Sequence, residues 1–180
     1  VLLVDAGSLE VRALVGSADF DDAAIQGQVN GVRAPRSPGS ALKPFVYGLA
    51  IDRGLIHPGS LLDDAPLAFR DFNPENFDRD FMGPIRAADA LVSSRNLPAV
   101  SLAARLPPDA LHDLLAAARV RRLGSAAHHG LALVLGGVEV SMEELGSLYA
   151  MLARRGEWAP LRLREDIPRE AGIRLLGPEA

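Results

Sequence analysis

Apolar and polar positions alternate along the chain in blocks that predict a mixture of strands and helices. Two short apolar runs, residues 1–5 and 10–16, flank an Ala-Gly-Ser turn and predict a β-hairpin at the N-terminus. The polar stretch 17–36 predicts a loop. Later apolar blocks with capping or proline signals predict helices over residues 40–53, 85–92, 98–106, from Pro107 to about 120, and 141–155.

Local capping and turn signals refine this pattern. Ser141 and Glu144 form a predicted capping box, and Gly156 is the expected helix stop. Pro44 lacks an N–H, so we expect it to distort the first turn of the helix at 40–53. Prolines at 58, 66 and 74 predict a long surface excursion over residues 55–80, and residues 158–164 alternate weakly enough to suggest a strand.

Composition narrows the classes of function. The length of 180 residues suits one domain, and 48% hydrophobic with 23% charged residues is typical of a globular protein. A net charge of −4 offers no basic field for nucleic acid, and the absence of cysteine excludes disulfides and thiolate chemistry. There is no apolar run of about 18 residues. The chain starts at Val1 inside a predicted strand; we infer an excerpt whose export signal or anchor lies upstream.

Lys43 is the only lysine in the chain, and Ser40 precedes it by three residues. Positions i and i+3 share one face of a helix, so the hydroxyl and the amine are expected to be neighbours. A neutral lysine can remove the proton of a serine, whereas arginine cannot. Two plainer explanations stay open at this level: codon bias that spares one lysine, and a helix-capping serine beside a solvated lysine.

Ser94-Arg95-Asn96 is the only Ser-x-Asn tripeptide, and it lies between two predicted helices. We expect its side chains to point into a cleft. A serine hydroxyl can relay a proton, and an asparagine amide can both donate to and accept from a substrate amide. A polar turn that caps the helix at Pro98 is the alternative explanation.

Taken together, these motifs resemble the transpeptidase domain of class A penicillin-binding proteins, for which Ser-x-x-Lys, a second serine–asparagine motif and Lys-Thr-Gly are the signatures. The segment around Ser40 reads APRSPGSALKPF, and the segment around Ser94 reads ALVSSRNLPAV. Further similarity extends over residues 1–164, including 14–20, 73–78, 83–85, 131–141 and 149–156.

The resemblance implies a role for each motif residue. Ser40 would attack the penultimate D-alanine carbonyl of a peptidoglycan stem peptide, and β-lactams would acylate the same hydroxyl. Lys43 would accept the proton of Ser40, and Ser94 would pass a proton to the departing D-alanine. Asn96 would orient the substrate, and Gly39 would let the backbone approach it. Either Lys43 or Ser94 remains open as the acylation base. No metal or other cofactor is implied.

The implied fold is α/β, the penicillin-recognising fold of serine β-lactamases and transpeptidases, with an antiparallel sheet between helical layers. We expect residues 1–180 to be one partial transpeptidase domain with no second domain. The implied function is peptidoglycan cross-linking at the periplasmic face of the inner membrane. The parent protein would carry a glycosyltransferase domain and a membrane anchor upstream.

One departure concerns the third motif. The chain has no threonine and therefore no Lys-Thr-Gly. We expect it to be truncated before that motif, to be weakly active or inactive alone, and to associate with another chain through an exposed sheet edge.

Two other classes of function stay open: a β-lactamase-like Ser–Lys hydrolase, and a non-catalytic module that binds cell-wall peptide or a partner protein. The remaining polar features have plain interpretations. Asp63-Asp64 is expected to be a solvated loop pair and His128-His129 to be ordinary loop residues. His57 and His112 lack partners at metal-ligand spacing, and Trp158 is expected in the core.

Overall fold

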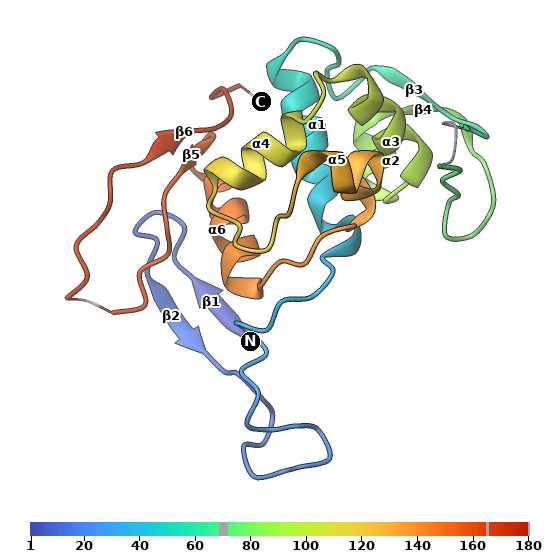
Figure 1. Cartoon of the computed structure of the whole chain (residues 1–180). Helices are drawn as coiled ribbons and strands as arrows, with labels where there is room; N and C mark the ends of the chain where they lie inside the picture. The colour runs from blue at the N-terminus through green and yellow to red at the C-terminus, as the bar shows by residue number, and fades with distance from the viewer. Residues whose placement is uncertain (69–71, 165, 180) are drawn as a thin grey trace. The chain divides into compact units, whose positions relative to one another are not determined.

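A computed structural model of the chain describes residues 1–68, 72–164 and 166–179 (Figure 1). Residue contacts divide the chain into two compact units. The first comprises Val1–Arg36, Leu115–Leu123 and Glu139–Pro178, and the second comprises Ser37–Leu114 and Gly124–Val138 with the last two residues. The expectation of a single partial domain over 1–180 stays a prediction.

The first unit begins with the predicted hairpin. Strands β1 (Leu2–Val4) and β2 (Val11–Leu14) pair antiparallel, with a register shift between Leu3 and Val4. The following stretch up to Arg36 contains no helix or strand in the described residues, so the predicted loop is also confirmed. Arg36 is joined to Val140 by a backbone bridge.

Helix α6 (Met142–Ala153) is the main helix of this unit and begins as predicted. The Ser141 hydroxyl accepts from the Glu144 N–H at 3.2 Å, and the Glu144 carboxylate accepts from the Ser141 N–H at 2.8 Å. This reciprocal pair satisfies two amides that the helix leaves unpaired. After α6, strand β5 (Glu157–Trp158) pairs with β6 (Ile173–Arg174), and the buried Trp158 donates to Ser147 at 3.1 Å.

The second unit opens on a short 3₁₀ helix, η1 (Gly39–Leu42), that continues into α1 (Lys43–Asp52). Pro44 falls in the first turn of α1, where helical N–H groups have no partner within the helix, so its missing N–H is tolerated there. The distortion expected from Pro44 takes the form of the change from 3₁₀ to α geometry. Gly54 follows with a positive φ of 65° and ends the helix region as predicted.

Two strands that the sequence did not predict follow α1. Strand β3 (Leu61–Asp64) lies within the predicted surface excursion and pairs antiparallel with β4 (Gly83–Arg86). The predicted surface excursion over residues 55–80 therefore contains a strand that the sequence did not predict. Residues 69–71 of the excursion lie outside the described residues. The helix predicted from residue 85 begins later, because Ile85 pairs with Leu62 in the strand ladder.

Helices complete the second unit. Helix α2 (Ala87–Val92) is followed by α3 (Asn96–Arg105), whose residues 97–100 are fully buried and which contacts α1. Helix α4 (Ala110–Ala117) follows the prolines as predicted, while α5 (Ala126–His129) and the 3₁₀ helix η2 (Gly130–Leu135) were not predicted. No helix in the described ranges is both long and apolar enough to span a bilayer.

Candidate active site

The start of α1 places Ser40 and Lys43 on successive turns of one continuous helical segment. Ser40 lies in η1 and is exposed, whereas Lys43 is the first residue of α1 and is 1% exposed. Neither the hydroxyl nor the N–H of Ser40 makes a hydrogen bond within the described part of the chain. Both groups are therefore available to a substrate. The backbone N–H of Lys43 donates to the Ser40 carbonyl oxygen, but Lys43 Nζ is not hydrogen-bonded to the Ser40 hydroxyl.

The buried ammonium of Lys43 points to the Ser-x-Asn tripeptide. Its Nζ donates to the Ser94 carbonyl oxygen, to the Ser94 hydroxyl oxygen at 3.1 Å and to Asn96 Oδ1 at 2.6 Å. These three acceptors use the three donors of an ammonium group. The structure thus brings together three of the predicted site residues, Lys43, Ser94 and Asn96.

Electrostatics at this position favour a neutral lysine. Burial and, to a smaller extent, the positive charge of Arg95 together lower the pKa of Lys43 from its ordinary 10.5 to about 8. All three groups that accept from Lys43 are uncharged, so no carboxylate opposes the shift by direct contact. An appreciable neutral fraction near pH 8 is what a general base requires.

Ser94 adopts a backbone conformation that is uncommon for a residue with a side chain. Its φ is 54°, in the left-handed region. The end of α2 holds this turn, because the Ser94 N–H donates to Leu91 O at 3.0 Å and the Arg95 N–H donates to Ala90 O at 2.9 Å. Such conformations persist only where the surroundings impose them, and they cluster at functional sites.

Arg95 does not point into a cleft, so that expectation for the middle residue of the tripeptide is wrong. The side chain is buried, and its Nε donates to Asp64 Oδ2 at 2.7 Å. Its Nη1 donates to Asp78 Oδ2 at 2.6 Å, and its Nη2 donates to the carbonyl of Asp80. A guanidinium presents its donors in a fixed fork, which suits such multiple acceptors.

Asn76 connects this ion-pair cluster to Asn96. Its side-chain nitrogen donates to Asp64 Oδ1 at 2.8 Å and to Asp80 O at 2.9 Å, and its Oδ1 accepts from the Asn96 N–H at 2.9 Å. The Asn96 side-chain nitrogen donates to Glu75 O at 2.6 Å. One N–H of the Asn96 side-chain amide therefore stays available for a substrate. Asn96 is the first residue of α3 and not part of the linker between the helices.

Gly39 lies directly against Gly136, the first glycine of the Leu-Gly-Gly segment. Gly39 has a φ of 53°, and a Cβ on it would meet nothing within 4 Å. A Cβ on Gly136 would collide with the backbone nitrogen and Cα of Gly39. The Ser37 hydroxyl also donates to Gly136 O at 2.7 Å. Gly136 therefore fixes the turn that carries Ser40 through backbone contact.

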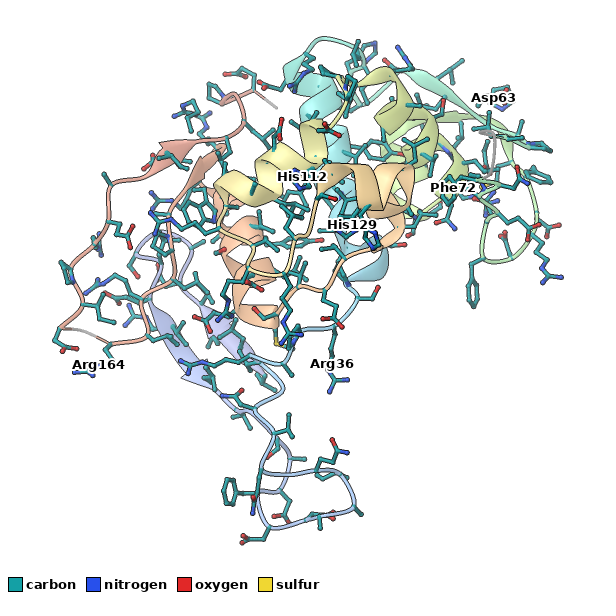
Figure 2. All side chains as sticks on the ribbon, in the orientation of Figure 1. Arg36, Asp63, Phe72, His112, His129 and Arg164 are labelled. Carbon is teal, nitrogen blue, oxygen red and sulfur yellow. The ribbon has the colours of Figure 1, made fainter. Side chains whose placement is uncertain are left out.

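Several residues of this region escaped the sequence analysis. Asp64 is 0% exposed and belongs to β3, so the interpretation of Asp63-Asp64 as a solvated loop pair is wrong; only Asp63, labelled in Figure 2, is exposed. The buried Tyr47 hydroxyl has no hydrogen-bond partner among the described residues, and burial raises the pKa of Tyr47 well above its ordinary value. Asn76 did lie within a segment that carried the family resemblance.

The histidines lie apart from the Lys43 contacts. His128 and His129 belong to α5 rather than to a loop, so that expectation is wrong. His112 lies in α4, with its Nε2 3.2 Å from Gly124 O, and Figure 2 shows it and His129 on neighbouring helical segments. Within the described ranges, no cluster of three histidine or acidic residues has the geometry to hold a metal ion.

Comparison with known proteins identifies the family. The model of the penicillin binding protein transpeptidase domain matches residues 1–171. The chain belongs to this family. Penicillin-binding protein 1C of Escherichia coli K12 is 44% identical over 174 residues, which are 93% of this chain and 22% of that protein. Penicillin-binding protein 1F of Bacillus subtilis is 32% identical over 151 residues, 82% of this chain and 20% of that protein.

Solved structures of transpeptidase domains confirm the predicted fold. The transpeptidase domain of Burkholderia pseudomallei penicillin-binding protein 3 matches with a TM-score of 0.78 at 19% identity, over 98% of this chain and 57% of that one. Penicillin-binding protein PonA1 from Mycobacterium tuberculosis matches with a TM-score of 0.80 at 22% identity, over 98% and 51%. The chain thus spans about a fifth of these curated relatives and about half of the solved chains.

The resemblance inferred from the sequence is therefore confirmed, including its class A character and the similarity to penicillin-binding protein 1C. Within the described residues, the strands of this transpeptidase-family chain form three antiparallel pairs.

Proposed function

We propose that this domain forms an acyl-enzyme on Ser40 with the D-Ala-D-Ala end of a peptidoglycan stem peptide, and that β-lactams acylate the same hydroxyl. Membership of the transpeptidase family sets the reaction class. The observation that carries the proposal is the buried Lys43 ammonium, which contacts Ser94 and Asn96 and has a lowered pKa. The exposed Ser40 hydroxyl lies on the turn just before it.

The reaction follows from these positions. Neutral Lys43 accepts the Ser40 proton as the hydroxyl oxygen bonds to the carbonyl carbon of the penultimate D-alanine. The unpaired Ser40 N–H stabilises the developing oxyanion. Ser94, already hydrogen-bonded to Lys43 at 3.1 Å, passes a proton to the nitrogen of the departing D-alanine as the peptide bond breaks. The amine of a second stem peptide then attacks the ester and restores the Ser40 hydroxyl.

Asn96 and Gly39 would bind the substrate in this scheme. The remaining N–H of the Asn96 amide donates to a carbonyl of the stem peptide, while its Oδ1 stays with Lys43. Gly39 presents no side chain beside Ser40, so the peptide backbone can approach it closely. We extend the proposal to a longer parent protein. It would carry a glycosyltransferase domain and a membrane anchor and would work at the periplasmic face of the inner membrane.

Covalent labelling tests this function. The domain is incubated with a fluorescent penicillin, and the labelled fraction is compared between the wild type and Ser40→Ala, with Ser37→Ala as the matched control. We expect slow labelling of the wild type and of Ser37→Ala, and none of Ser40→Ala. Absence of any label both on this chain and on a longer chain that carries Lys-Thr-Gly would favour a non-catalytic module that binds cell-wall peptide or a partner protein. Rapid release of the label would favour a β-lactamase-like hydrolase.

A further inference from the structure

The middle residue of the Ser-x-Asn tripeptide has a structural role that the transpeptidase reaction does not assign to it. Lys43 contacts the residues on both sides of Arg95, namely Ser94 and Asn96. Arg95 itself is 7% exposed, and its side-chain hydrogen bonds go to Asp64, Asp78 and Asp80 rather than to the groups that accept from Lys43. An arginine is seldom buried unless it is paired, so this placement calls for an explanation.

The partners of Arg95 come from two segments of the second unit. Asp64 comes from β3 and is fully buried, while Asp78 and the Asp80 carbonyl come from the excursion before β4. Asp78 is half exposed, and its hydrogen bond to Arg95 lowers the pKa of its carboxyl below the ordinary value. The same two carboxylates raise the pKa of Arg95, so its charge is permanent.

This cluster reaches Lys43 by two routes. The first is mechanical, because the Asp64 carboxylate binds both Arg95 and Asn76, and Asn76 accepts from the Asn96 N–H. The second is electrostatic, because the positive charge of Arg95 contributes to the lowered pKa of Lys43. Asp64 and Asp78 bind that guanidinium and so hold its charge in place.

We propose that Arg95 is a positioning residue: its guanidinium, held by Asp64 and Asp78, fixes the backbone that carries Ser94 and Asn96 and keeps a permanent positive charge beside Lys43. The charge favours loss of the Lys43 proton, and the fork geometry holds the strained Ser94 turn against α2. The benefit of this role to catalysis rests on the proposed function. The geometry and the effect of the Arg95 charge on Lys43 can be measured without any acylation.

The single lysine of the chain allows a direct test. Labelling with lysine carrying ¹³C at Cε gives one side-chain signal by NMR, and its shift against pH reports the protonation of Lys43. We expect a wild-type midpoint near 8. In Arg95→Met the cation is removed while Asp64 and Asp78 keep their charges, so the midpoint rises toward the ordinary value of lysine by more than about 0.3 pH units. Arg86→Met, which removes an exposed arginine paired with Asp89, is the matched control and leaves the midpoint unchanged.

Two more variants guard against misfolding and separate charge from position. Arg95→Met leaves the buried Asp64 carboxylate unpaired, so the double variant with Asp64→Asn removes that charge and is expected to raise the midpoint as well. Arg95→Lys keeps the charge but cannot span the three acceptors. Because this variant contains a second lysine, it is measured by hydrogen exchange alone. Exchange of the Asn96 N–H, which Asn76 holds in the wild type, should become faster.

A Lys43 midpoint that stays within about 0.3 pH units of wild type in both Arg95→Met and the double variant would overturn the charge role. Unchanged Asn96 exchange in Arg95→Lys would overturn the positioning role. Penicillin labelling of the same samples keeps the two proposals apart. If neither the wild type nor a longer chain that carries Lys-Thr-Gly is ever labelled, but the Lys43 midpoint responds to Arg95 as stated, the proposed function is contradicted and this inference is supported.

Discussion

The Lys43 ammonium nitrogen lies 3.1 Å from the Ser94 hydroxyl oxygen, although 51 residues separate the two in the chain. Helix α1 supplies the lysine and the turn between α2 and α3 supplies the serine. A proton can therefore move between Lys43 and Ser94 without any rearrangement of either side chain. The predictions below follow from this contact and from the elements that hold it.

Lys43→Arg should abolish acylation and preserve the fold. Arginine keeps the positive charge but cannot become neutral in a protein, so no base is left for Ser40. General-base catalysis is commonly worth about 10²–10⁴ in rate, and we expect a loss of that order. The measurement is the rate of penicillin labelling, with circular dichroism as the check on folding. Arg53→Lys, on the exposed residue after the same helix, is the control. A near-normal rate in Lys43→Arg would mean that the lysine acts as an electrostatic support.

The lowered pKa of Lys43 also predicts a pH dependence of stability. Below about pH 8 the lysine is protonated in both the folded and the unfolded states, and the full cost of burying the charge is present. Between about 8 and the ordinary value of 10.5 only the unfolded state binds the proton, so stability rises with pH. The free energy of unfolding of the wild type should therefore gain about 2 kcal/mol between pH 7 and 9.5 relative to Lys43→Met.

Urea unfolding of the two proteins at several pH values measures this difference. The comparison with Lys43→Met cancels the contribution of every other titrating group, provided that the two proteins share a fold. A wild-type advantage that does not change with pH would mean that Lys43 has an ordinary pKa in the folded domain.

Two glycine substitutions at the Ser40 turn should have different effects. In Gly136→Ala the new methyl group collides with the Gly39 backbone, so we expect a displaced Ser40 turn and at least about a tenfold loss of labelling rate. In Gly39→Ala the methyl group meets nothing within the protein, so the positive φ costs about 1–2 kcal/mol of stability, and any loss of labelling comes from obstruction of the substrate. Thermal unfolding and labelling rates of both variants are the measurement. A wild-type labelling rate in Gly136→Ala would show that the contact between the glycines does not set the position of Ser40.

The missing third motif makes a prediction about rate. No Lys-Thr-Gly occurs in the chain, and a second oxyanion donor with a cation for the substrate carboxylate is expected from that motif. Loss of one such donor typically costs about 10²–10³ in rate. We expect a longer chain that carries Lys-Thr-Gly after residue 180 to be labelled faster by at least this factor. Stopped-flow acylation of the two proteins side by side decides it, and equal rates would show that residues 1–180 suffice.

Elements set by neighbouring residues could be predicted from the sequence. The hairpin β1–β2 follows from two apolar runs around a turn, and the start of α6 follows from the capping box at Ser141 and Glu144. Strand β3 could not be predicted in this way, because its four residues carry no clear period and its partner β4 follows only after the excursion. The helix predicted from residue 85 began too early for a similar reason. Ile85 pairs with Leu62, and this long-range contact is not visible in the local sequence pattern.

The same distinction between local signals and long-range contacts applies to the site residues. The spacing of Ser40 and Lys43 is a local signal that the sequence carries by itself. Contact between Lys43 and Ser94 is not local, and only the family resemblance suggested it. Arg95 and Asp64 were missed because arginine and aspartate are mostly exposed, and nothing in the sequence states that these two are buried together.

The identity of the acylated residue tests the central claim most directly. The domain is incubated with penicillin to completion, digested and analysed by mass spectrometry, and the modified serine is located by fragmentation of the peptide. The account predicts a single penicilloyl adduct on Ser40, lost in Ser40→Ala and retained in Ser37→Ala. An adduct on Ser37 or Ser94 in the wild type would contradict it.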